Sequence, residues 1–489
     1  MTDENNNTYD VIVLGAGPVG ENVADRTVAA GLSTVIVESE LVGGECSYWA
    51  CEPSKALLRP VLLYGEASRF PGVGAAVTGP IDTAAVLRHR DYMVSDWDDK
   101  GQVDWVASAG ITLVRGHGRL AGPRRVTVAT PEGGTVELTA RHAVAVCTGT
   151  SASLPPLPGL DELRYWTSRE ATSAEQVPGR LVILGAGVVA VEMATAWQAL
   201  GTRVTLVARG SGLLGRVESF ASEMVADRLR SAGVDLRFES GIAAAERPDG
   251  PDGEVHVTLA DGSLIVADEL LFATGRSPRT EDIGLDTIGL KPGTWISTDD
   301  TFTATDVDGD WLYAVGDVNH RALLTHQGKY QARIVGGVIA DRAAGIALDT
   351  ETWGRSVGTA DQLAVPQVVF TDPEVAAVGL GTEDAARAGR TVDVVDYEIG
   401  HVAGAIQHDP KYVGRARILI DPERRTIVGA TFAGGGVAEL LHSATIAITG
   451  EVTIDRLWHA VPSFPTISEI WLRLLETYRD QQAESAGSE

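Results

Sequence analysis

The stretch YDVIVLGAGPVGENVADRTVAAG, residues 9–31, decides the fold of this 489-residue chain. Residues 10–14 are typical of a buried strand, and a glycine turn leads from them into a helix that begins near Val19. The turn has the G-x-G-x-x-G pattern, in which the first glycine permits a tight turn and the second lets the backbone approach a pyrophosphate. The third glycine packs the helix against the strand. The three glycines are Gly15, Gly17 and Gly20.

An acidic residue follows at the position that a dinucleotide fold requires. The next strand, STVIVES, ends in Glu38, whose carboxylate is placed to accept hydrogen bonds from ribose hydroxyls. The helix N-terminus offers amide donors and the positive end of its dipole to phosphates. Strand, glycine turn, helix and acid together predict a first dinucleotide-binding unit.

The same unit recurs at GRLVILGAGVVAVEMATAWQALGTRVTLVARG, residues 179–210. Gly185, Gly187 and Ala190 occupy the three small-residue positions, but the second strand runs into Arg209 instead of an acid. An acid would repel a 2′-phosphate, whereas an arginine attracts one. Arg209, together with Arg216, therefore predicts NADPH in preference to NADH. The alternative is that both arginines are solvated surface residues.

Three shorter segments fit a flavin dinucleotide beside a nicotinamide. CTGTSASLPPLPG closes a strand on Thr148 and Gly149 before a proline-rich linker, and LLFATGRSPRTEDIGL has a similar turn at Gly275. LYAVGDV ends a strand at Asp317, an acid that is suited to hold the sugar-like chain of a flavin.

Composition narrows the classes of function. The chain has 40 basic and 66 acidic residues and a formal net charge of -26, which disfavours a nucleic-acid partner. The start, MTDENNNTYDVIVLG, has no basic region typical of a signal peptide, and we expect no membrane span. Three cysteines in so long a chain predict no disulfide scaffold. The expected setting is a reducing cytoplasm.

Two of these cysteines, Cys46 and Cys51, lie close together in GGECSYWACEPSK. Such a pair is a metal clip, a structural disulfide or a redox dithiol. On an ideal helix, Cα atoms five residues apart are about 8.6 Å apart, beyond the roughly 7 Å that a disulfide spans. A bridge therefore requires a loosened turn, and a bond held in that way is easily reduced. A zinc site needs four ligands, which this region lacks, so we favour the redox dithiol.

The ordered motifs GAGPVGENVA, GGECSYWACEPSK, CTGT, GAGVVAVE, ATGRSPRT, AVGDV, VFTDPEVAAVG and FPTISE resemble the class I pyridine nucleotide-disulfide oxidoreductases. That family includes dihydrolipoamide dehydrogenase, glutathione reductase and mercuric reductase. The resemblance implies an α/β fold with two Rossmann-like domains and a C-terminal α+β dimerisation domain, in a homodimer. It predicts an FAD domain at residues 1–160 and 282–360 and an NAD(P)H domain at 161–281. The dimerisation domain is predicted at 361–489, with a disordered tail from about residue 480.

The resemblance also implies roles for individual residues. Electrons pass from NADPH through FAD to a Cys46–Cys51 disulfide, with Cys51 next to the flavin and Cys46 as the outer thiol. Lys55 lies by the flavin and pairs with Glu192. The residues predicted to hold FAD are Gly15, Gly17, Gly20, Glu38, Gly44, Lys55, Gly118, Thr148, Gly149 and Asp317. Those predicted to hold NAD(P)H are Gly185, Gly187, Glu192, Arg209, Arg216 and Gly275.

The C-terminal motif departs from the family. Disulfide-reducing members carry His-Pro-Thr and then a glutamate, and in the dimer the histidine serves as acid and base for the dithiol of the other subunit. Here Phe464 stands in its place, Glu469 remains as a predicted catalytic acid, and His459 is the nearest histidine. Phenylalanine moves no proton, which disfavours the reduction of lipoamide or glutathione disulfide.

The predicted function is therefore NAD(P)H-dependent reduction of a disulfide or another small electron acceptor. The alternatives are a dihydrolipoamide dehydrogenase, a quinone or metal-ion reductase, and a redox sensor or binding flavoprotein with little turnover. Mercuric reductase also lacks the histidine, but it uses a C-terminal cysteine pair, and no cysteine follows Cys147 here.

Tyr48 and Trp49 either border the substrate pocket or pack against the interior. Cys147 is predicted to be a buried core residue.

Overall fold

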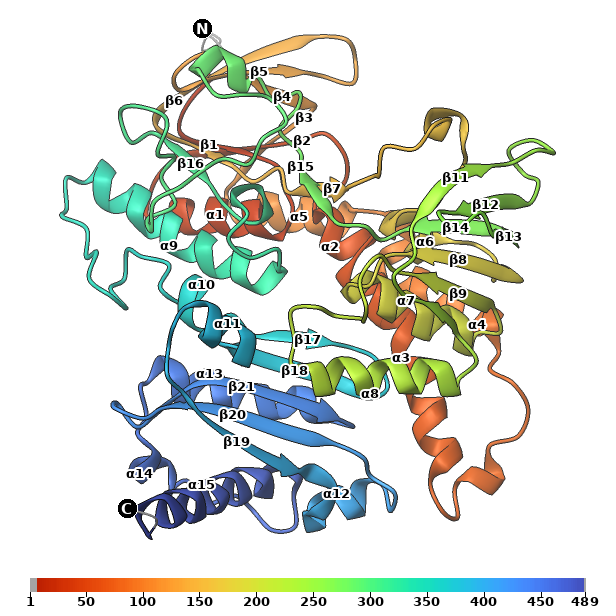
Figure 1. Ribbon diagram of the computed structural model, residues 1–489. Coiled ribbons are helices and arrows are strands. Elements are labelled where there is room, and N and C mark those ends of the chain that lie inside the picture. The colour runs from red at the N-terminus through yellow and green to blue at the C-terminus, as the bar shows by residue number, and fades with distance from the viewer. Residues whose placement is uncertain (1–6, 488–489) are drawn as a thin grey trace, which may run out of the picture. The chain divides into compact units, whose positions relative to one another are not determined.

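The computed structural model describes residues 7–487, which form two compact units (Figure 1). The first unit is built from residues up to 53, 90–153 and 276–362, and the second from 54–89, 154–275 and residues from 363 on. Most residues of the segments predicted as NAD(P)H-binding and dimerisation domains fall in the second unit, whereas residues 276–281 and 361–362 belong to the first. The three-domain boundaries therefore stay a prediction.

The first unit contains a seven-stranded sheet in the order β3-β2-β1-β6-β5-β4, with β16 paired to β6. Strands β1, β2, β3, β6 and β16 are parallel, whereas β4 and β5 are antiparallel to their neighbours. The strands are β1 (Thr8–Leu14), β2 (Thr34–Glu38), β3 (Thr112–Arg115), β4 (His117–Leu120), β5 (Arg125–Ala129), β6 (Thr135–Val146) and β16 (Leu312–Ala314). Strands β7 (Thr150–Ala152) and β15 (Arg276–Pro278) form a separate antiparallel pair.

Strand β1 is apolar throughout its buried part because both faces of the sheet are covered. Val11 and Val13 pack into one hydrophobic cluster, and Ile12 and Leu14 pack into another. Helix α1 (Pro18–Ala29) begins with a proline, whose fixed φ suits the first helical position. It runs beside α9 (Thr325–Ala343), as Figure 1 shows. The strand and helix predicted around the first glycine turn are thus confirmed.

The other helices of this unit include the short α2 (Gly44–Tyr48) and α5 (Lys100–Ser108). Helix α3 (Cys51–Arg69) begins in the first unit, and α4 (Thr83–Met93) ends there. Helix α10 (Ala360–Leu363) ends at the beginning of the last segment of the second unit.

The second unit contains a parallel sheet in the order β10-β9-β8-β14, formed by β8 (Arg180–Leu184), β9 (Arg203–Val207), β10 (Asp235–Arg237) and β14 (Glu269–Phe272). Its helices are α6 (Ser168–Ser173), α7 (Val188–Ala199) and α8 (Ser219–Ser231). A three-stranded antiparallel sheet consists of β11 (Ile242–Glu246), β12 (Val255–Leu259) and β13 (Leu264–Ala267). The prediction of two Rossmann-like parallel sheets is confirmed.

The C-terminal part of this unit is a five-stranded antiparallel sheet in the order β17-β18-β21-β20-β19. Its strands are β17 (Gln367–Val369), β18 (Glu374–Gly379), β19 (Asp393–Glu398), β20 (Arg415–Asp421) and β21 (Thr426–Gly434). Its helices are α11 (Thr382–Arg387), α12 (Ala403–His408), α13 (Leu441–Thr449), α14 (Ile454–Leu457) and α15 (Ile470–Gly487). The α+β character predicted for this region is confirmed.

The prediction of a disordered tail from about residue 480 was wrong up to residue 487. Helix α15 continues to Gly487, and its last turns consist mainly of Gln, Ala and Glu, which have high helix propensity. Residues 488–489 lie outside the described residues.

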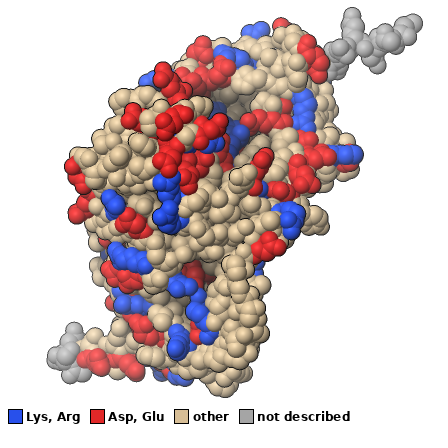
Figure 2. Space-filling model, turned by 90° about the vertical axis from the view of Figure 1, so that its right-hand side faces the viewer, with Lys and Arg blue, Asp and Glu red and all other residues tan. Residues whose placement is uncertain are grey.

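The surface carries both signs of charge. On the face drawn in Figure 2, Lys and Arg side chains lie scattered among the Asp and Glu side chains. In the part of the chain that the structure describes, no helix is long and apolar enough to cross a membrane.

Candidate functional site

The two cysteines lie on either side of a helix break. Helix α2 ends at Tyr48, Trp49 has non-helical dihedral angles (φ -137°, ψ 0°), and helix α3 begins at Cys51. The loosened turn that the spacing requires is therefore present. Cys46 and Cys51 are thiols in this structure, so the disulfide between them stays a prediction.

The two thiols interact directly. A hydrogen bond with Cys51, and then burial, raises the pKa of the Cys46 thiol above its ordinary value. The Cys51 sulfur lies 3.2 Å from the hydroxyl oxygen of Thr325, the first residue of α9. The hydrogen bond to Cys51 favours the protonated Cys46 thiol, so the negative charge of a singly ionised pair is favoured on Cys51. The Thr325 hydroxyl interacts with both sulfurs and does not by itself distinguish them.

Tyr48 packs against the interior and does not act on the thiols. Its side chain is buried, its hydroxyl donates to the Val42 carbonyl oxygen at 3.1 Å, and burial raises the pKa of this phenol to about 12. The Trp49 ring meets it edge to face, with ring centroids 5.7 Å apart. For Tyr48, the interior alternative is the correct one.

The first glycine turn has the geometry of a dinucleotide site. Gly15 has φ +98°, and a Cβ built there would lie 2.5 Å from the Cys147 carbonyl oxygen. A Cβ on Gly20 would lie 1.9 Å from the Gly15 oxygen, so only glycine fits where helix meets strand. A Cβ on Gly17 would lie 3.9 Å from the Gly44 Cα atom, an ordinary contact distance, so packing within the chain does not require this glycine. Close approach of a pyrophosphate to its backbone stays the predicted reason for it.

Two further glycines predicted to hold FAD serve packing. A Cβ on Gly44 would lie 2.7 Å from the Gly17 Cα atom, so the first turns of α1 and α2 touch there. A Cβ on Gly118 would lie 2.8 Å from a methyl group of Leu14 and 3.0 Å from one of Val37. Close backbone packing alone therefore accounts for both glycines.

The polar residues predicted around FAD are partly engaged. Glu38 accepts the Ala16 and Glu40 amides at 2.6 and 2.7 Å, one on each carboxylate oxygen. Asp317, whose pKa burial raises, accepts the Thr150 hydroxyl at 2.7 Å. Gly149 has φ +67° and open space beside its Cα.

Thr148 is the exception, because its buried hydroxyl has no hydrogen-bond partner among the described residues. An unpaired buried hydroxyl is rare in a folded protein and indicates a partner outside the chain. Together with the open space beside Gly149, it is compatible with the predicted binding of a dinucleotide such as FAD.

The predicted ion pair between Lys55 and Glu192 is present in the second unit. The Lys55 ammonium lies 2.9 Å from one oxygen of Glu192, and the other oxygen accepts the Phe370 backbone amide at 3.0 Å. The ammonium also lies 4.8 Å from the centre of the Phe370 ring. Glu192 is buried, so the pair compensates a carboxylate that is removed from water.

The second glycine turn repeats the geometry of the first. Gly185 has φ +135°, and a Cβ there would lie 2.2 Å from the Ala273 oxygen, whereas a Cβ on Gly187 meets no other atom within 4 Å. Ala190 is fully buried, and Gly275 has φ +130°.

Arg209 and Arg216 are exposed, and neither forms an ion pair with another residue that the structure describes. Arg209 is the second residue after β9 and follows Ala208, whose amide donates to the Arg237 carbonyl oxygen. The Arg209 guanidinium group is therefore available for an anionic ligand close to the end of this strand.

Phe464, the residue at which the C-terminal motif departs from the family pattern, lies on the surface of this chain. The Phe464 side chain is 75% exposed, and His459 is exposed as well. Glu469 is buried and accepts the Arg473 guanidinium at 2.6 Å through one oxygen. Its other oxygen has no partner within the described part of the chain. Glu469 therefore serves as the acidic half of an ion pair with α15, and its catalytic role stays a prediction.

Cys147 lies in the core. It is 7% exposed, and burial raises the pKa of its thiol. The prediction of a small buried core residue is confirmed.

Sequence reasoning missed three residues near these sites, namely Thr325, Trp97 and Glu21. Of these three, only Glu21 had a visible signal in the sequence. Glu21 follows Gly20 on a face of α1 that also carries buried Ala24, which marks it as an acid on an apolar face. Its Oε1 atom is buried and has no partner among residues 7–487.

Replacing this buried acid tests its protonation. Burial raises the pKa of Glu21 from its ordinary value of 4.5 to about 7. The folded state therefore favours the protonated form of Glu21. The contribution of this proton binding to the free energy of unfolding is complete below pH 4.5 and is lost as pH rises through about 7. We expect Glu21→Gln to raise the free energy of unfolding by about 2 kcal/mol more at about pH 8.5 than at about pH 5.

Urea unfolding at both pH values measures this difference. Asp25→Asn, on the same helix but with a side chain 39% exposed, is the matched control and should show no such pH dependence. An equal effect of Glu21→Gln at both pH values would contradict the raised pKa.

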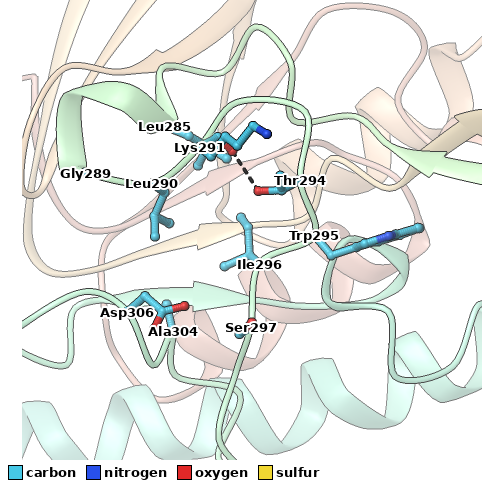
Figure 3. Close-up of a pocket in the computed structure, with 10 residues that line it drawn as sticks. All are labelled: Leu285, Gly289, Leu290, Lys291, Thr294, Trp295, Ile296, Ser297, Ala304 and Asp306. Atoms are coloured by element: carbon cyan, nitrogen blue, oxygen red, sulfur yellow. Dashed lines mark hydrogen bonds between the residues drawn. The ribbon is translucent and has the colours of Figure 1, made fainter.

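A pocket of about 360 Å³ lies elsewhere in the first unit (Figure 3). Its lining includes Leu290, Trp295 and Ile296, and none of its lining residues is a predicted site residue. The Trp295 ring points away from Leu290 and Ile296 and stacks on His320 at 4.1 Å. Its aromatic face is therefore already occupied. Within residues 7–487, no group of three or more His, Cys, Asp or Glu is placed to hold a metal ion.

Matches with known protein families cover most of the chain and include segments of both compact units. Residues 9–332 match the family described as pyridine nucleotide-disulphide oxidoreductase, and residues 365–474 match its dimerisation domain. Dihydrolipoyl dehydrogenase 3 of Pseudomonas aeruginosa is 31% identical over 470 residues, which cover 94% of this chain and 96% of that protein. A mercuric reductase of Staphylococcus aureus is 28% identical over 466 residues, which cover 94% of this chain and 81% of that protein.

A solved structure shares the fold. The Cu(II) complex of the HOCl-induced flavoprotein disulfide reductase RclA from Escherichia coli matches with a TM-score of 0.81 and 22% identity. The match covers 96% of this chain and 99% of that one. Two glycine turns, a close cysteine pair and the two sequence matches lead to one conclusion: the chain belongs to the pyridine nucleotide-disulphide oxidoreductase family, whose members depend on FAD and a pyridine nucleotide.

Proposed function

We propose that this protein is an NADPH-dependent flavoprotein reductase that delivers electrons through the Cys46–Cys51 pair. The observation that carries the proposal is the break between α2 and α3, which brings two free thiols into hydrogen-bond contact. In the first half-reaction, NADPH, a proton and the disulfide give NADP⁺ and two thiols. In the second, the acceptor takes two electrons and the disulfide forms again.

FAD, when bound, accepts hydride from the nicotinamide and passes an electron pair to sulfur. The open space beside Gly149 and the unpaired Thr148 hydroxyl support its predicted site. Glu38 and Asp317 supply carboxylates for ribose and ribityl hydroxyls, since each carboxylate oxygen has a lone pair beyond those now engaged.

The cysteines take different roles because their surroundings differ. The hydrogen bond within the pair keeps the proton on Cys46 and favours the thiolate on Cys51, so Cys51 is the thiol that exchanges electrons with the cofactor. Cys46, which retains its proton, is the thiol that meets the acceptor. Lys55 follows Cys51 by one turn of α3, and its charge, balanced by Glu192, favours a reduced anionic flavin.

A thiophilic metal ion is the acceptor class that suits this chain best among those without a proton relay. Two cysteine sulfurs provide soft ligands, and metal reduction expels no thiolate that must be protonated. The likeness to mercuric reductases supports this choice. Each NADPH supplies two electrons, which reduce one ion by two electrons or two ions by one. Dihydrolipoamide dehydrogenase activity, suggested by other relatives, is disfavoured by Phe464.

Anaerobic titration of the purified protein with NADPH tests the dithiol. We expect a long-wavelength charge-transfer absorption between the Cys51 thiolate and flavin to appear before the flavin is fully bleached. Direct bleaching without such a band would contradict the proposal. Steady-state NADPH oxidation with Hg²⁺, Cu²⁺, lipoamide or glutathione disulfide then ranks the acceptors. Lipoamide as the best of the four would contradict the preference for a metal ion.

Reversing the charge at Arg209 tests the nicotinamide preference. We expect Arg209→Glu to slow anaerobic flavin reduction by NADPH about tenfold to a hundredfold and to leave the rate with NADH nearly unchanged. The reason is that the arginine attracts a 2′-phosphate that NADH lacks. Stopped-flow absorbance measures both rates without a known acceptor.

Arg203→Glu is the control for this prediction, because Arg203 is an exposed arginine at the opposite end of β9. Equal losses with both nucleotides in Arg209→Glu would show that the residue does not read the 2′-phosphate.

The matched dimerisation domain supports a homodimer, which light scattering during size-exclusion chromatography measures directly. The low cysteine content, three in 489 residues, supports a reducing compartment such as the cytoplasm.

A further inference from the structure

The segment that follows α4 has an unusual backbone. Ser95, Asp96 and Trp97 form a turn in which all three residues have positive φ, at 53°, 49° and 58°. Side chains with a Cβ rarely adopt this left-handed conformation, and a run of three is strained. Backbone strain of this kind persists only where the surrounding structure enforces it, and it is found most often at functional sites.

The turn directs the Trp97 side chain at the helix that carries Cys46. The indole N–H donates to the Tyr48 carbonyl oxygen at 3.1 Å. Tyr48 is the last residue of α2, so its carbonyl oxygen accepts no hydrogen bond from within the helix. On its other side, the Trp97 ring lies 5.3 Å from the buried Arg90 guanidinium, which fixes the orientation of the indole.

Two residues further on, Asp99 holds the other end of the same helix. Its carboxylate accepts the Val42 backbone amide at 2.7 Å and also pairs with Arg115. The Tyr48 hydroxyl returns to the Val42 carbonyl at 3.1 Å, which joins the start and the end of the loop. Residues 97–99 therefore tether α2 at its entry and its exit, with Cys46 between the two contacts.

We propose that Trp97 and Asp99 are positioning residues that hold α2 so that Cys46 stays within bonding reach of Cys51. The inference rests on the proposed dithiol function. A one-turn helix next to a break has few internal hydrogen bonds, so its place depends on outside contacts. The tethers keep the effective concentration of one thiol near the other high, and this favours the disulfide over two separated thiols.

Loosening the tether should shift the equilibrium between the Cys46–Cys51 disulfide and the two thiols toward the thiols. The dithiol form gains freedom when α2 is released, whereas the disulfide form stays constrained by its own bond, so the equilibrium moves toward the dithiol. The hydrogen bond that the Cys46 thiol donates to Cys51, which raises the pKa of Cys46, also weakens, and a larger fraction of Cys46 is then thiolate. Disulfide formation and alkylation of Cys46 therefore report on the same contact.

The experiment compares Trp97→Phe with Trp105→Phe in the FAD-loaded protein. Phenylalanine keeps a ring over Arg90 but has no N–H, while Trp105 is an exposed tryptophan on α5. Samples equilibrated in glutathione redox buffers are quenched with acid, alkylated and measured by mass spectrometry. We expect Trp97→Phe to lower the equilibrium constant for the Cys46–Cys51 disulfide about 3- to 10-fold, as for the loss of one hydrogen bond. Iodoacetamide should alkylate Cys46 faster by a similar factor.

A wild-type protein with no reversible disulfide in these buffers would contradict the proposed function itself. A reversible wild-type couple that Trp97→Phe shifts no more than Trp105→Phe does would overturn the positioning role alone. The FAD content of each variant, compared with that of the wild type, reports whether it is folded. If Trp97→Phe does not fold, Asp99→Asn, which weakens the other tether, must give a shift in the same direction for the inference to stand.

Discussion

Cys51→Ser is expected to lose NADPH-dependent reduction of every acceptor that works through the dithiol, by a factor on the order of 10³. Serine is close to cysteine in size and can keep the contact with Thr325. However, it forms no disulfide, and its hydroxyl does not ionise near neutral pH. Reduction of bound FAD by NADPH should continue, because that step involves no sulfur. The charge-transfer absorption should be absent.

Cys46→Ser and Cys147→Ala make this prediction specific. Cys46→Ser keeps the Cys51 thiol, so it should lose turnover but retain the charge-transfer absorption. Cys147→Ala changes a core thiol that is 7% exposed and should leave both readouts as in the wild type. Turnover in Cys51→Ser within tenfold of the wild-type rate would show that electrons leave the flavin without passing through the cysteines.

Phe464→His is expected to raise kcat/KM for small disulfides such as lipoamide by about 10². Attack of Cys46 on a disulfide releases a thiolate that must gain a proton, and the resemblance to the family implies that position 464 reaches the dithiol of the second subunit. Phe464 is 75% exposed within one chain, so the substitution removes little internal packing. One oxygen of Glu469 has no partner among the residues described and is available to an imidazole.

The pH dependence separates a proton relay from a change in packing. The gain in Phe464→His should follow the ionisation of an imidazole, with an unperturbed pKa of about 6.5. Val461→His places a histidine on the same surface segment, at a residue 84% exposed, and should give no gain. No increase in Phe464→His would mean that the missing base is not what limits these substrates.

The sequence predicts the two parallel sheets because each glycine turn has a local physical cause. Gly15 and Gly185 need positive φ and close contact with a neighbouring strand, and no other residue meets both conditions. The break between the cysteines was predictable for a similar reason, since a regular helix holds residues 46 and 51 too far apart. Local geometry thus accounts for these predictions.

Contacts between distant segments could not be predicted in the same way. Thr325 lies 274 residues from Cys51, and nothing in its local sequence marks it as a partner of sulfur. The left-handed turn that ends at Trp97 contains no glycine, so propensity gives no signal for it. The alternatives for Tyr48 depended on where its hydroxyl points, which only the tertiary structure shows.

The carboxylate of Glu192 has a consequence for the engineering of this chain. One oxygen of Glu192 accepts a hydrogen bond from Lys55, and the other accepts one from the Phe370 amide. The carboxylate on α7 therefore connects three separate segments of the chain. A chimera that exchanged the segment after residue 363 for that of a relative would inherit a different backbone at position 370. A chimera with this boundary is therefore expected to fold only where the donor segment places a backbone amide within hydrogen-bond distance of the Glu192 carboxylate. A designer can check this contact in the donor structure before cloning.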